Sequence, residues 1–448
     1  MLTPEQALDY ANDVVARATH AGADAADSVV VSSGSTEVSV RLGKVEDIQR
    51  SESGDLGLRV FVGSRSASAS TSDLSRAAID ALVERTVAMA RLAPEDPFAA
   101  LAPAERLARG PFDDFDGNDG IDVEPDTLRL RALEAEDAAR AVEGVTNSEG
   151  GGASHGTGIT AIATSTGFGG ARGGSSHGVS ASVLAGEGAR MQRDYYGHSS
   201  RHLGDLDEAG AIGAEAGRRA VARLDPVRLK SGPMTVVFAP RVANSMLGHF
   251  AGAINGAAIA RKTSFLIDRL GQPVFAPGIS IIDDPWRQRG MRSRAFDGEG
   301  LATKPVALID NGVLTGWIAD VAAARQLGIE PTGHAWRGVS GAPGAGTSNL
   351  HMAAGRVSPE TLMADIADGF YVTELIGMGV NGLTGDYSRG ASGFRIQNGE
   401  ITGPVAEVTI AGNLKDMFAA LIPADDLIFR YGTNAPTVRI DGMMLAGA

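Results

Sequence analysis

The sequence predicts an α+β protein in two domains, a mixed helix and strand domain over residues 1–228 and a predominantly β, barrel-like domain over residues 229–448. Helical periodicities alternate with strand patterns in the first half, whereas strand patterns and Gly-rich turns dominate the second. A charged turn punctuated by Pro and Gly, residues 225–232, marks the boundary between them. A chain of 448 residues is also too long for one compact core.

The first part begins with a helix signal. Thr3 suits an N-cap, Pro4 the first turn and Gln6 a capping box, so we expect a helix through His20. The Pro-, Asp- and Gly-rich segment 93–125 is predicted to be a long loop. Periodicity predicts further helices over 73–92, 127–142 and 207–223, and short strands over 28–32, 37–42, 45–51, 57–62, 159–164, 179–184 and 191–201.

Strand patterns dominate the second part. Two Asn-Gly pairs, at 311–312 and 398–399, are typical of two-residue hairpin turns between the strands that flank them. Helices are expected over 242–259, 321–327 and 361–366. The strands that we expect cover 234–238, 279–283, 306–309, 313–317, 371–376, 394–397, 400–402 and 437–443.

A Gly-rich stretch after residue 376 demands an unusual backbone. Glycines at 377, 379, 382, 385, 390 and 393 indicate positive φ angles or close approach of another group. We interpret the segment as a loop that forms the wall of a cleft and displays Asp386, Tyr387, Ser388 and Arg389. The candidate peptide-binding residues are Asp386, Tyr387, Arg389, Gly379, Gly382 and Gly385.

Composition excludes several classes of function. The net charge of −14 and the pI near 5.1 describe a surface that repels nucleic acid and anionic lipid. The N-terminus lacks the basic and apolar regions of a signal peptide, and the small-apolar run 245–260 is too short to cross a bilayer. We therefore expect a cytoplasmic protein without direct nucleic-acid or membrane partners. A chain without cysteine has no thiol catalysis and no thiolate metal site.

Three generic motifs are present without the structural context they need. The G-x-G-x-x-G match at 377–382 is followed by more glycines, not by the helix that a dinucleotide site requires. The G-x-S-x-G matches around Ser154 and Ser176 precede strand patterns, so we interpret them as turns that lead into strands and not as hydrolase elbows. No histidine is followed by Glu, which excludes an H-E-x-x-H zinc helix.

Histidines offer the remaining metal ligands. His155, His177, His198 and His202 occur in the Gly-rich middle region, where a solvated or hydrogen-bonded role is the ordinary one. His249 lies on the predicted helix 242–259, four residues after Ser245 and thus on the same face. Whether the histidines meet in space stays open at this point.

Four long motifs carry a family resemblance. They are TELIGMGVNGLTGDYSRGASGF (373–394), AGNLKDMF (411–418), GHAWRGVSGAPGAGTSNL (333–350) and DNGVLTGW (310–317). Through them the whole chain resembles the TldD/PmbA family, also described as modulators of DNA gyrase, and within it the PmbA (TldE) branch. The resemblance implies a subunit that pairs with a TldD-type sister in a cytoplasmic metalloprotease for small or unfolded peptides.

The same resemblance locates a degenerate metal motif. The H-E-x-x-x-H helix of the TldD branch aligns with 244–249, where Asn244 replaces the first ligand, Ser245 replaces the general base and only His249 remains. A catalytic zinc needs about three protein ligands and a base, which this set does not supply. We therefore predict that this chain binds no metal cofactor and that zinc belongs to the TldD-type partner.

Two alternatives remain beside this prediction. One is an autonomous metallopeptidase with an atypical site, for example His249 with His155, His177 or His198. The other is a protein that binds and modulates DNA gyrase. Whether the isolated chain forms a homodimer in the absence of its sister stays open, as do the peptide sequence preference and the roles of Asp386, Tyr387 and Arg389.

Overall fold

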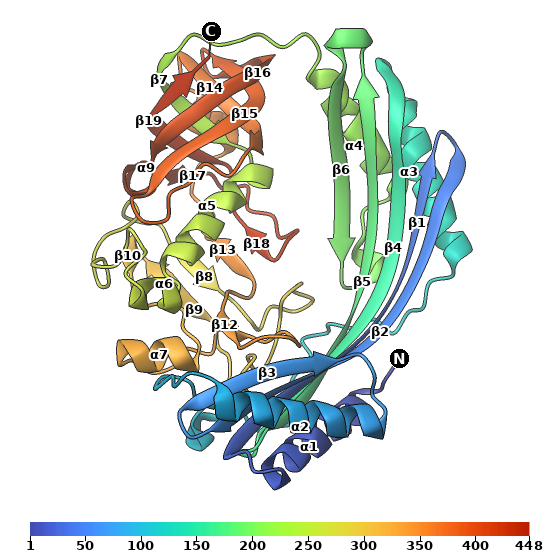
Figure 1. Ribbon diagram of the computed structural model, residues 1–448. Coiled ribbons are helices and arrows are strands. Elements are labelled where there is room, and N and C mark those ends of the chain that lie inside the picture. The colour runs from blue at the N-terminus through green and yellow to red at the C-terminus, as the bar shows by residue number, and fades with distance from the viewer. Residues whose placement is uncertain (448) are drawn as a thin grey trace.

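The computed structural model describes residues 1–447, and their N-terminal half forms one long, curved, antiparallel sheet (Figure 1). The strand order is β3-β2-β1-β4-β5-β6, so strands from both ends of this half meet at the β1–β4 pair. The strands are β1 (Ala25–Arg41), β2 (Lys44–Val62), β3 (Arg65–Thr71), β4 (Val145–Thr164), β5 (Gly169–Ala185) and β6 (Gln192–Ser200).

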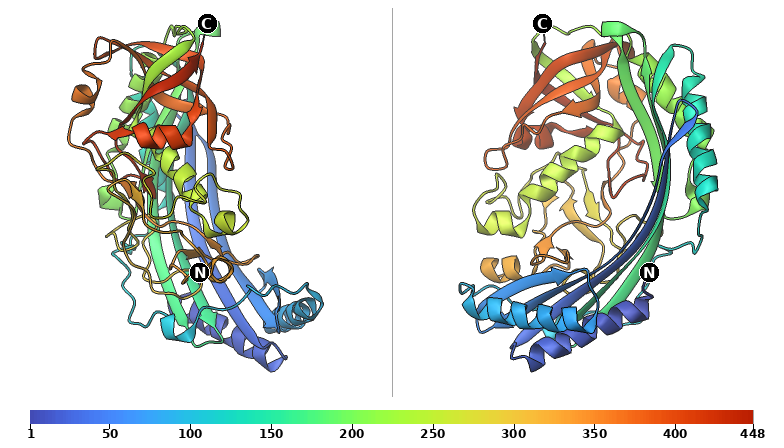
Figure 2. Two further views of the ribbon diagram at one scale, coloured as in Figure 1. Left: turned by 90° about the vertical axis from the view of Figure 1, so that its left-hand side faces the viewer. Right: turned by 45° about the vertical axis from the view of Figure 1, so that its right-hand side comes forward.

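Four helices cover the outer face of this sheet, and the C-terminal half lies on its concave side (Figure 2). Thr3 and Gln6 form the expected capping box at the start of α1. The loop 93–125 is confirmed and contains only the short turn η1 (Ala104–Arg106) as regular helix. The helices are α1 (Pro4–His20), α2 (Arg76–Leu92), α3 (Pro125–Arg140) and α4 (Ala209–Ala222).

The prediction of many short strands was wrong in the first half. Residues 25–62 form two long strands instead of four short ones, and Ser154 and Ser176 lie inside β4 and β5 instead of in turns. Several of these strand positions are glycine because another backbone segment approaches the strand too closely for a side chain. A Cβ on Gly57 would overlap the carbonyl group of Val339, and one on Gly151 would overlap the carbonyl oxygen of Ala132.

The C-terminal half is built around a second six-stranded sheet with the order β16-β15-β14-β7-β19-β17. An additional pairing of β16 with β19 closes five of these strands into a barrel, as the sequence predicted. Aromatic and aliphatic side chains fill the barrel and the space beneath it. The strands are β7 (Gly232–Phe238), β14 (Asp368–Ile376), β15 (Asp386–Gln397), β16 (Glu400–Asn413), β17 (Ile422–Pro423) and β19 (Val438–Ala446).

A smaller sheet and short helices complete this half. Both Asn-Gly turns are confirmed: Asn311 and Asn398 have φ of 47° and 51°, and a glycine follows each. The smaller sheet has β8 (Ile281–Asp283), β9 (Val306–Asp310), β10 (Val313–Leu314), β13 (Leu350–Met352) and β18 (Thr433–Asn434), and a separate pair joins β11 (Ala335–Trp336) to β12 (Gly344–Ala345). The short helices are α7 (Val321–Leu327), α8 (Pro359–Met363) and α9 (Leu414–Ala420).

The predicted helix 242–259 is two helices, α5 (Pro240–Ala253) and α6 (Gly256–Ala260). Asn255 separates them, because its side chain accepts a hydrogen bond from the Ala257 amide as the N-cap of α6. Its amide nitrogen also donates to the Ala345 carbonyl oxygen at 2.9 Å. No helix within residues 1–447 has both the length and the apolar character needed to span a membrane.

Buried ion pairs join the two halves. Arg59 of β2 and Arg337 of the C-terminal half both bind the carboxylate of Asp27, the latter at 2.9 Å. Farther up the sheet, Asp194 of β6 accepts a hydrogen bond from Arg241 at 2.9 Å. These contacts hold the concave face of the sheet against the C-terminal half. The division at residues 225–232 falls between α4 and β7 and stays a prediction.

Candidate functional site

Three of the predicted site residues meet between α5 and β15. The ring of His249, on α5, packs edge-on against the ring of Tyr387, with centroids 6.1 Å apart. Arg389 follows Tyr387 by two residues and therefore shares its face of β15. The sequence motif around His249 and the Gly-rich motif thus form one site, which we call the His249 cluster.

The polar atoms of the His249 cluster lack partners. Within residues 1–447, His249 Nε2, the Tyr387 hydroxyl and Arg389 Nε are buried and make no hydrogen bond. Burial, and then the charge of Arg389, lower the pKa of His249, so its imidazole is neutral near pH 7. Burial likewise raises the pKa of Tyr387, which stays a neutral hydroxyl. Most buried polar groups in native structures are hydrogen-bonded, so three unpaired groups side by side require an explanation.

The donor set of the His249 cluster does not fit zinc. A neutral imidazole is a suitable ligand, but its charged neighbour is the guanidinium of Arg389, which repels a cation. Ser245 Oγ donates to the Val242 carbonyl oxygen at 2.7 Å, within its own helix. No group of three or more His, Asp or Glu side chains suited to a metal occurs in the described part of the chain. These residues therefore do not supply the ligand set of a catalytic zinc ion.

The position of Tyr387 and its neighbours corrects the predicted loop. Residues 386–389 begin strand β15, and Tyr387 is only 1% exposed, so it is not displayed on a cleft wall. Asp386 is exposed and braces the preceding loop, since its carboxylate accepts hydrogen bonds from Thr384 at 2.6 Å and Asn413 at 3.0 Å. These two bonds lower the pKa of Asp386. Its role at this point is structural.

Two different structural requirements explain why Gly385 and Gly379 of this loop are glycine. Gly385 has a φ of +86°, which a side chain would strain, and a Cβ on Gly379 would overlap the Ser388 carbonyl oxygen. Gly382 faces open space. No helix follows the G-x-G-x-x-G match, because the chain passes directly into β15, so the dinucleotide interpretation is excluded.

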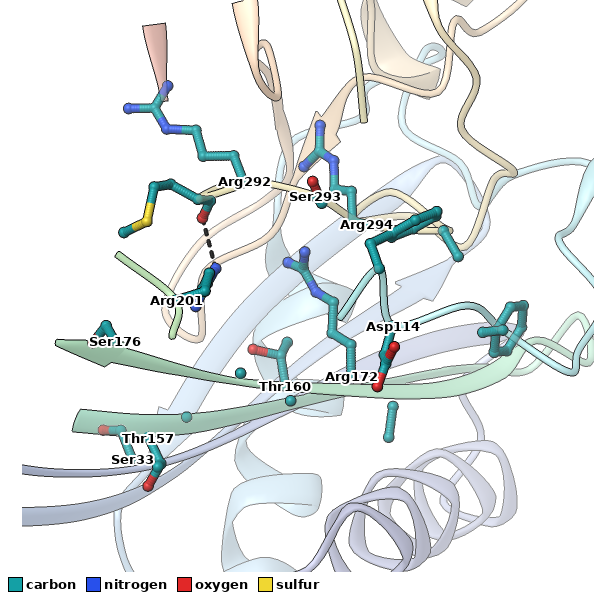
Figure 3. A pocket seen from close by; sticks show the side chains of 18 of the residues that line it. Ser33, Asp114, Thr157, Thr160, Arg172, Ser176, Arg201, Arg292, Ser293 and Arg294 are labelled. Atoms are coloured by element: carbon teal, nitrogen blue, oxygen red, sulfur yellow. Dashed lines mark hydrogen bonds between the residues drawn. The ribbon is translucent and has the colours of Figure 1, made fainter. Parts of the chain in front are cut away.

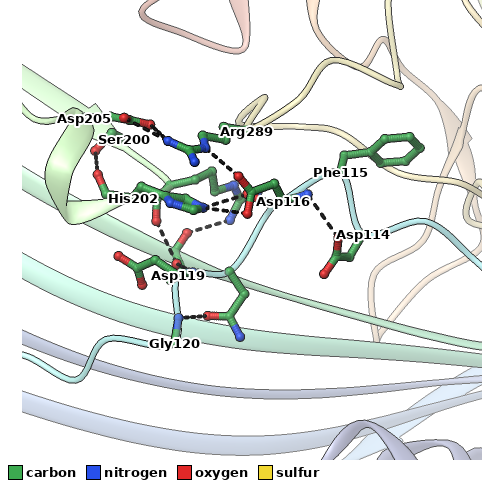
Figure 4. Close-up of polar contacts among 12 residues, drawn as sticks. Asp114, Phe115, Asp116, Asp119, Gly120, Ser200, His202, Asp205 and Arg289 are labelled. Atoms are coloured by element: carbon green, nitrogen blue, oxygen red, sulfur yellow. Dashed lines mark hydrogen bonds and ion pairs between the residues drawn. The ribbon is translucent and has the colours of Figure 1, made fainter.

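The histidines of the N-terminal sheet form separate groups. His155 and His177 pair across β4 and β5 with ring centroids 4.8 Å apart, and Asp119 lies 2.9 Å from His177 Nε2. His202 contacts Asp116, which Arg289 also binds (Figure 4). His155 and His177 lie on the outer, helix-covered face, since their strand neighbours pack against α3 and α4. The sets of His249 with His155, His177 or His198 are not assembled within residues 1–447.

The sequence analysis did not predict two cavities that lie between the N-terminal and C-terminal halves. One has a volume of about 600 Å³ and includes Tyr196, Arg219, Tyr371 and Arg430. The other, of about 470 Å³, is lined by four arginines (Figure 3). The segment RQRGMRSR (287–294), with four arginines in an acidic chain, was a usable signal for the second cavity. The first cavity had no local signal because its walls come from distant segments.

Comparison with known families decides the relationship. Models of the PmbA/TldA metallopeptidase match in order as domain 1 over residues 26–90, the central domain over 118–224 and the C-terminal domain over 231–447. This chain belongs to the PmbA/TldD family. The resemblance drawn from the four sequence motifs is thereby confirmed.

Individual PmbA/TldD relatives agree along the whole chain. Metalloprotease PmbA of Escherichia coli O157:H7 is 37% identical, over 95% of this chain and 92% of the relative. The PmbA homolog of Haemophilus influenzae is 35% identical, over 99% and 96%. A crystal structure from Bacteroides thetaiotaomicron, described as a candidate modulator of DNA gyrase, covers both chains completely with 28% identity and a TM-score of 0.92. TldE of Thermococcus kodakarensis shares the fold, with 20% identity, a TM-score of 0.88 and coverage of 98% and 100%.

Proposed function

We propose that this chain is the PmbA/TldE-type subunit of a cytoplasmic PmbA/TldD metalloprotease complex that degrades small or unfolded peptides, and that a TldD-type sister supplies the catalytic metal. One observation carries the proposal: the metal-motif position on α5 holds a single imidazole with Arg389 as its charged neighbour. One ligand is too few for a catalytic zinc, and an adjacent cation lowers its affinity further.

The His249 cluster contributes to peptide binding only indirectly. The Tyr387 hydroxyl and Arg389 Nε are buried donors without partners among residues 1–447, so a peptide does not reach them in this structure. Leaving such groups unpaired costs free energy. In this role the chain positions a peptide while the chemistry takes place in the sister.

The Gly-rich loop next to the His249 cluster offers a surface for the sister subunit. Ile376, Met378 and Leu383 are large apolar side chains that are 57%, 87% and 58% exposed. Exposed apolar side chains that gather on one segment are typical of interaction surfaces. The hydrogen bonds of Asp386 and the left-handed backbone of Gly385 hold this loop in shape, which lowers the entropy cost of docking.

Reconstitution tests the proposal. The purified chain is assayed with an unstructured peptide in the presence of zinc, and then together with its TldD-type sister. We expect hydrolysis only in the presence of both subunits. Met378→Asp is expected to weaken association with the sister, and Met89→Asp, on the exposed side of α2, is the matched control that leaves it unchanged.

Hydrolysis by the chain with zinc alone would overturn the proposal, provided that His249→Ala abolishes it. An active complex in which the sister carries a defective metal site would do the same. Gel filtration of the isolated chain answers a separate question, because a homodimer that dissociates when the sister is added fits the proposed assembly.

A further inference from the structure

The arginine-lined cavity lies between the concave face of the sheet and the C-terminal half (Figure 3). Its floor is made of small residues that face each other across three strands: Ser33 pairs with Gly158, Gly158 with Gly174, and Gly156 with Ser176. A Cβ on Gly158 would meet no atom within 4 Å, so the space above this floor is open. The volume of about 470 Å³ is in the range of ligand sites.

Four arginines from three segments line this cavity, which we call the arginine pocket: Arg172 on β5, Arg201 after β6, and Arg292 and Arg294 in the C-terminal half. Arg201 donates to the carbonyl oxygens of Ser175 and Met291, at 3.0 and 2.6 Å. Arg294 is 2% exposed, stacks over the ring of Trp336 at 4.2 Å and donates to the Ala335 carbonyl oxygen at 3.2 Å.

None of the arginines that line the arginine pocket is paired with a carboxylate in the described part of the chain. Among residues 1–447, Arg172 makes no hydrogen bond, and none of the four arginines makes an ion pair. Arg201 Nε and Arg294 Nε are buried without a partner. Burial, and then the charges of Arg294 and Arg201, lower the pKa of Arg172 to about 10, which still leaves it charged at neutral pH.

Two carboxylates, those of Asp113 and Asp114, also line the arginine pocket, but neither forms an ion pair with an arginine among the described residues. Asp113 and Asp114 accept hydrogen bonds from the amides of Phe115 and Asp116, at 2.7 and 3.0 Å. Asp297 is buried and accepts from three backbone amides, those of Glu299, Leu301 and Ala335. Arg292 is exposed, but Arg172, Arg201 and Arg294 are buried or half-buried cations without an ion pair, which is costly to fold, and an anionic ligand would offset this cost.

We propose that the arginine pocket binds the carboxylates of an acidic peptide segment. Guanidinium groups bind carboxylates with two parallel hydrogen bonds, and groups from three segments match carboxylates at several points along a peptide. The volume exceeds that of one small ion, and the rings of Trp336 and Phe112 form an apolar wall for the stems of the acidic side chains. This inference deepens the proposed function, on which it rests for the choice of a peptide ligand.

The test measures binding to the full chain without its sister. The probe is fluorescently labelled hexaglutamate, compared with hexalysine and with unlabelled inorganic phosphate as a competitor, at an ionic strength of about 0.05 M. We expect saturable binding of hexaglutamate and none of hexalysine. Arg172→Met is expected to weaken binding by about tenfold. Arg190→Met is the matched control, since Arg190 is 74% exposed and outside the pocket, and it leaves binding unchanged.

Two results would overturn the proposal. Equal binding of hexaglutamate by the Arg172→Met variant and the unaltered chain would show that the probe binds elsewhere. Phosphate that displaces hexaglutamate completely at equal concentration would assign the pocket to small phosphoanions instead of peptides. This binding assay uses the chain without its sister, so its result is independent of the reconstitution assay. Binding of hexaglutamate by the chain, together with an inactive reconstituted complex, would contradict the proposed function but not the proposed binding site.

Discussion

Replacement of Arg172 by methionine is expected to stabilise the free protein. Burial, and then the charges of the neighbouring arginines, lower the pKa of this guanidinium from its ordinary value to about 10. A lowered pKa on a base means that the folded state disfavours the charged form, so the charge destabilises the fold at every pH below about 10. Methionine keeps a similar length without the charge.

The expected gain in the free energy of unfolding follows from the lowered pKa of Arg172. The lowering of the Arg172 pKa to about 10 corresponds to at most about 3.5 kcal/mol, and water that reaches the half-buried side chain reduces this to about 1–2 kcal/mol. Urea unfolding of the variant and of the unaltered chain, at low and at high salt, measures the gain. High salt should reduce it, because salt screens the repulsion among the arginines.

A clear loss of stability in the Arg172→Met variant would refute this reasoning, since it would mean that the guanidinium contributes to the fold. A gain that Arg190→Met reproduces would also refute it, because Arg190 is exposed and its replacement should change the free energy of unfolding by less than about 0.5 kcal/mol. The combination of a stabilised fold and weakened hexaglutamate binding is specific to a residue that serves a ligand.

Burial raises the pKa of Glu299 to about 8, so the free energy of unfolding should fall as the pH rises from about 4.5 to 8. Glu299→Gln should remove about 2–4 kcal/mol of this fall, while its side-chain oxygen still accepts a hydrogen bond from the Val321 amide. A variant with the same pH profile as the unaltered chain would contradict this prediction. Gly213→Ala should lower the free energy of unfolding by more than about 2 kcal/mol, because its Cβ would overlap the Ala135 carbonyl oxygen, as thermal denaturation would show. Gly248→Ala, on an exposed turn of α5 with nothing within 4 Å, should instead add about 0.5–1 kcal/mol in the same assay, and a loss there would mean that this glycine serves more than the helix.

Local chemistry was enough to predict part of the fold. The capping box at Thr3 and the turns at Asn311 and Asn398 were predictable because each depends on a few adjacent residues. The long strands β4 and β5 were not, since their Gly- and Ser-rich sequences are held extended by pairing with distant strands and by close backbone contacts. Strand propensity does not contain that information.

The sequence likewise predicted some features of the candidate site and missed others. His249 was found from its motif, and its contact with Tyr387 joins two motifs that the sequence had marked separately. The burial of Tyr387 was missed because a dense run of glycines resembles a loop whether or not a strand follows. The arginine pocket was missed because Arg172 and Arg294 are brought together only by the packing of the two halves.

We propose that this subunit has too few donor atoms to hold a catalytic zinc ion. The zinc content of the chain purified alone, after equilibration with zinc and removal of the unbound ion, tests this proposal. We predict far less than one zinc ion per chain, and the same low content for His249→Ala. One tightly bound zinc ion per chain that is lost on His249→Ala would contradict it.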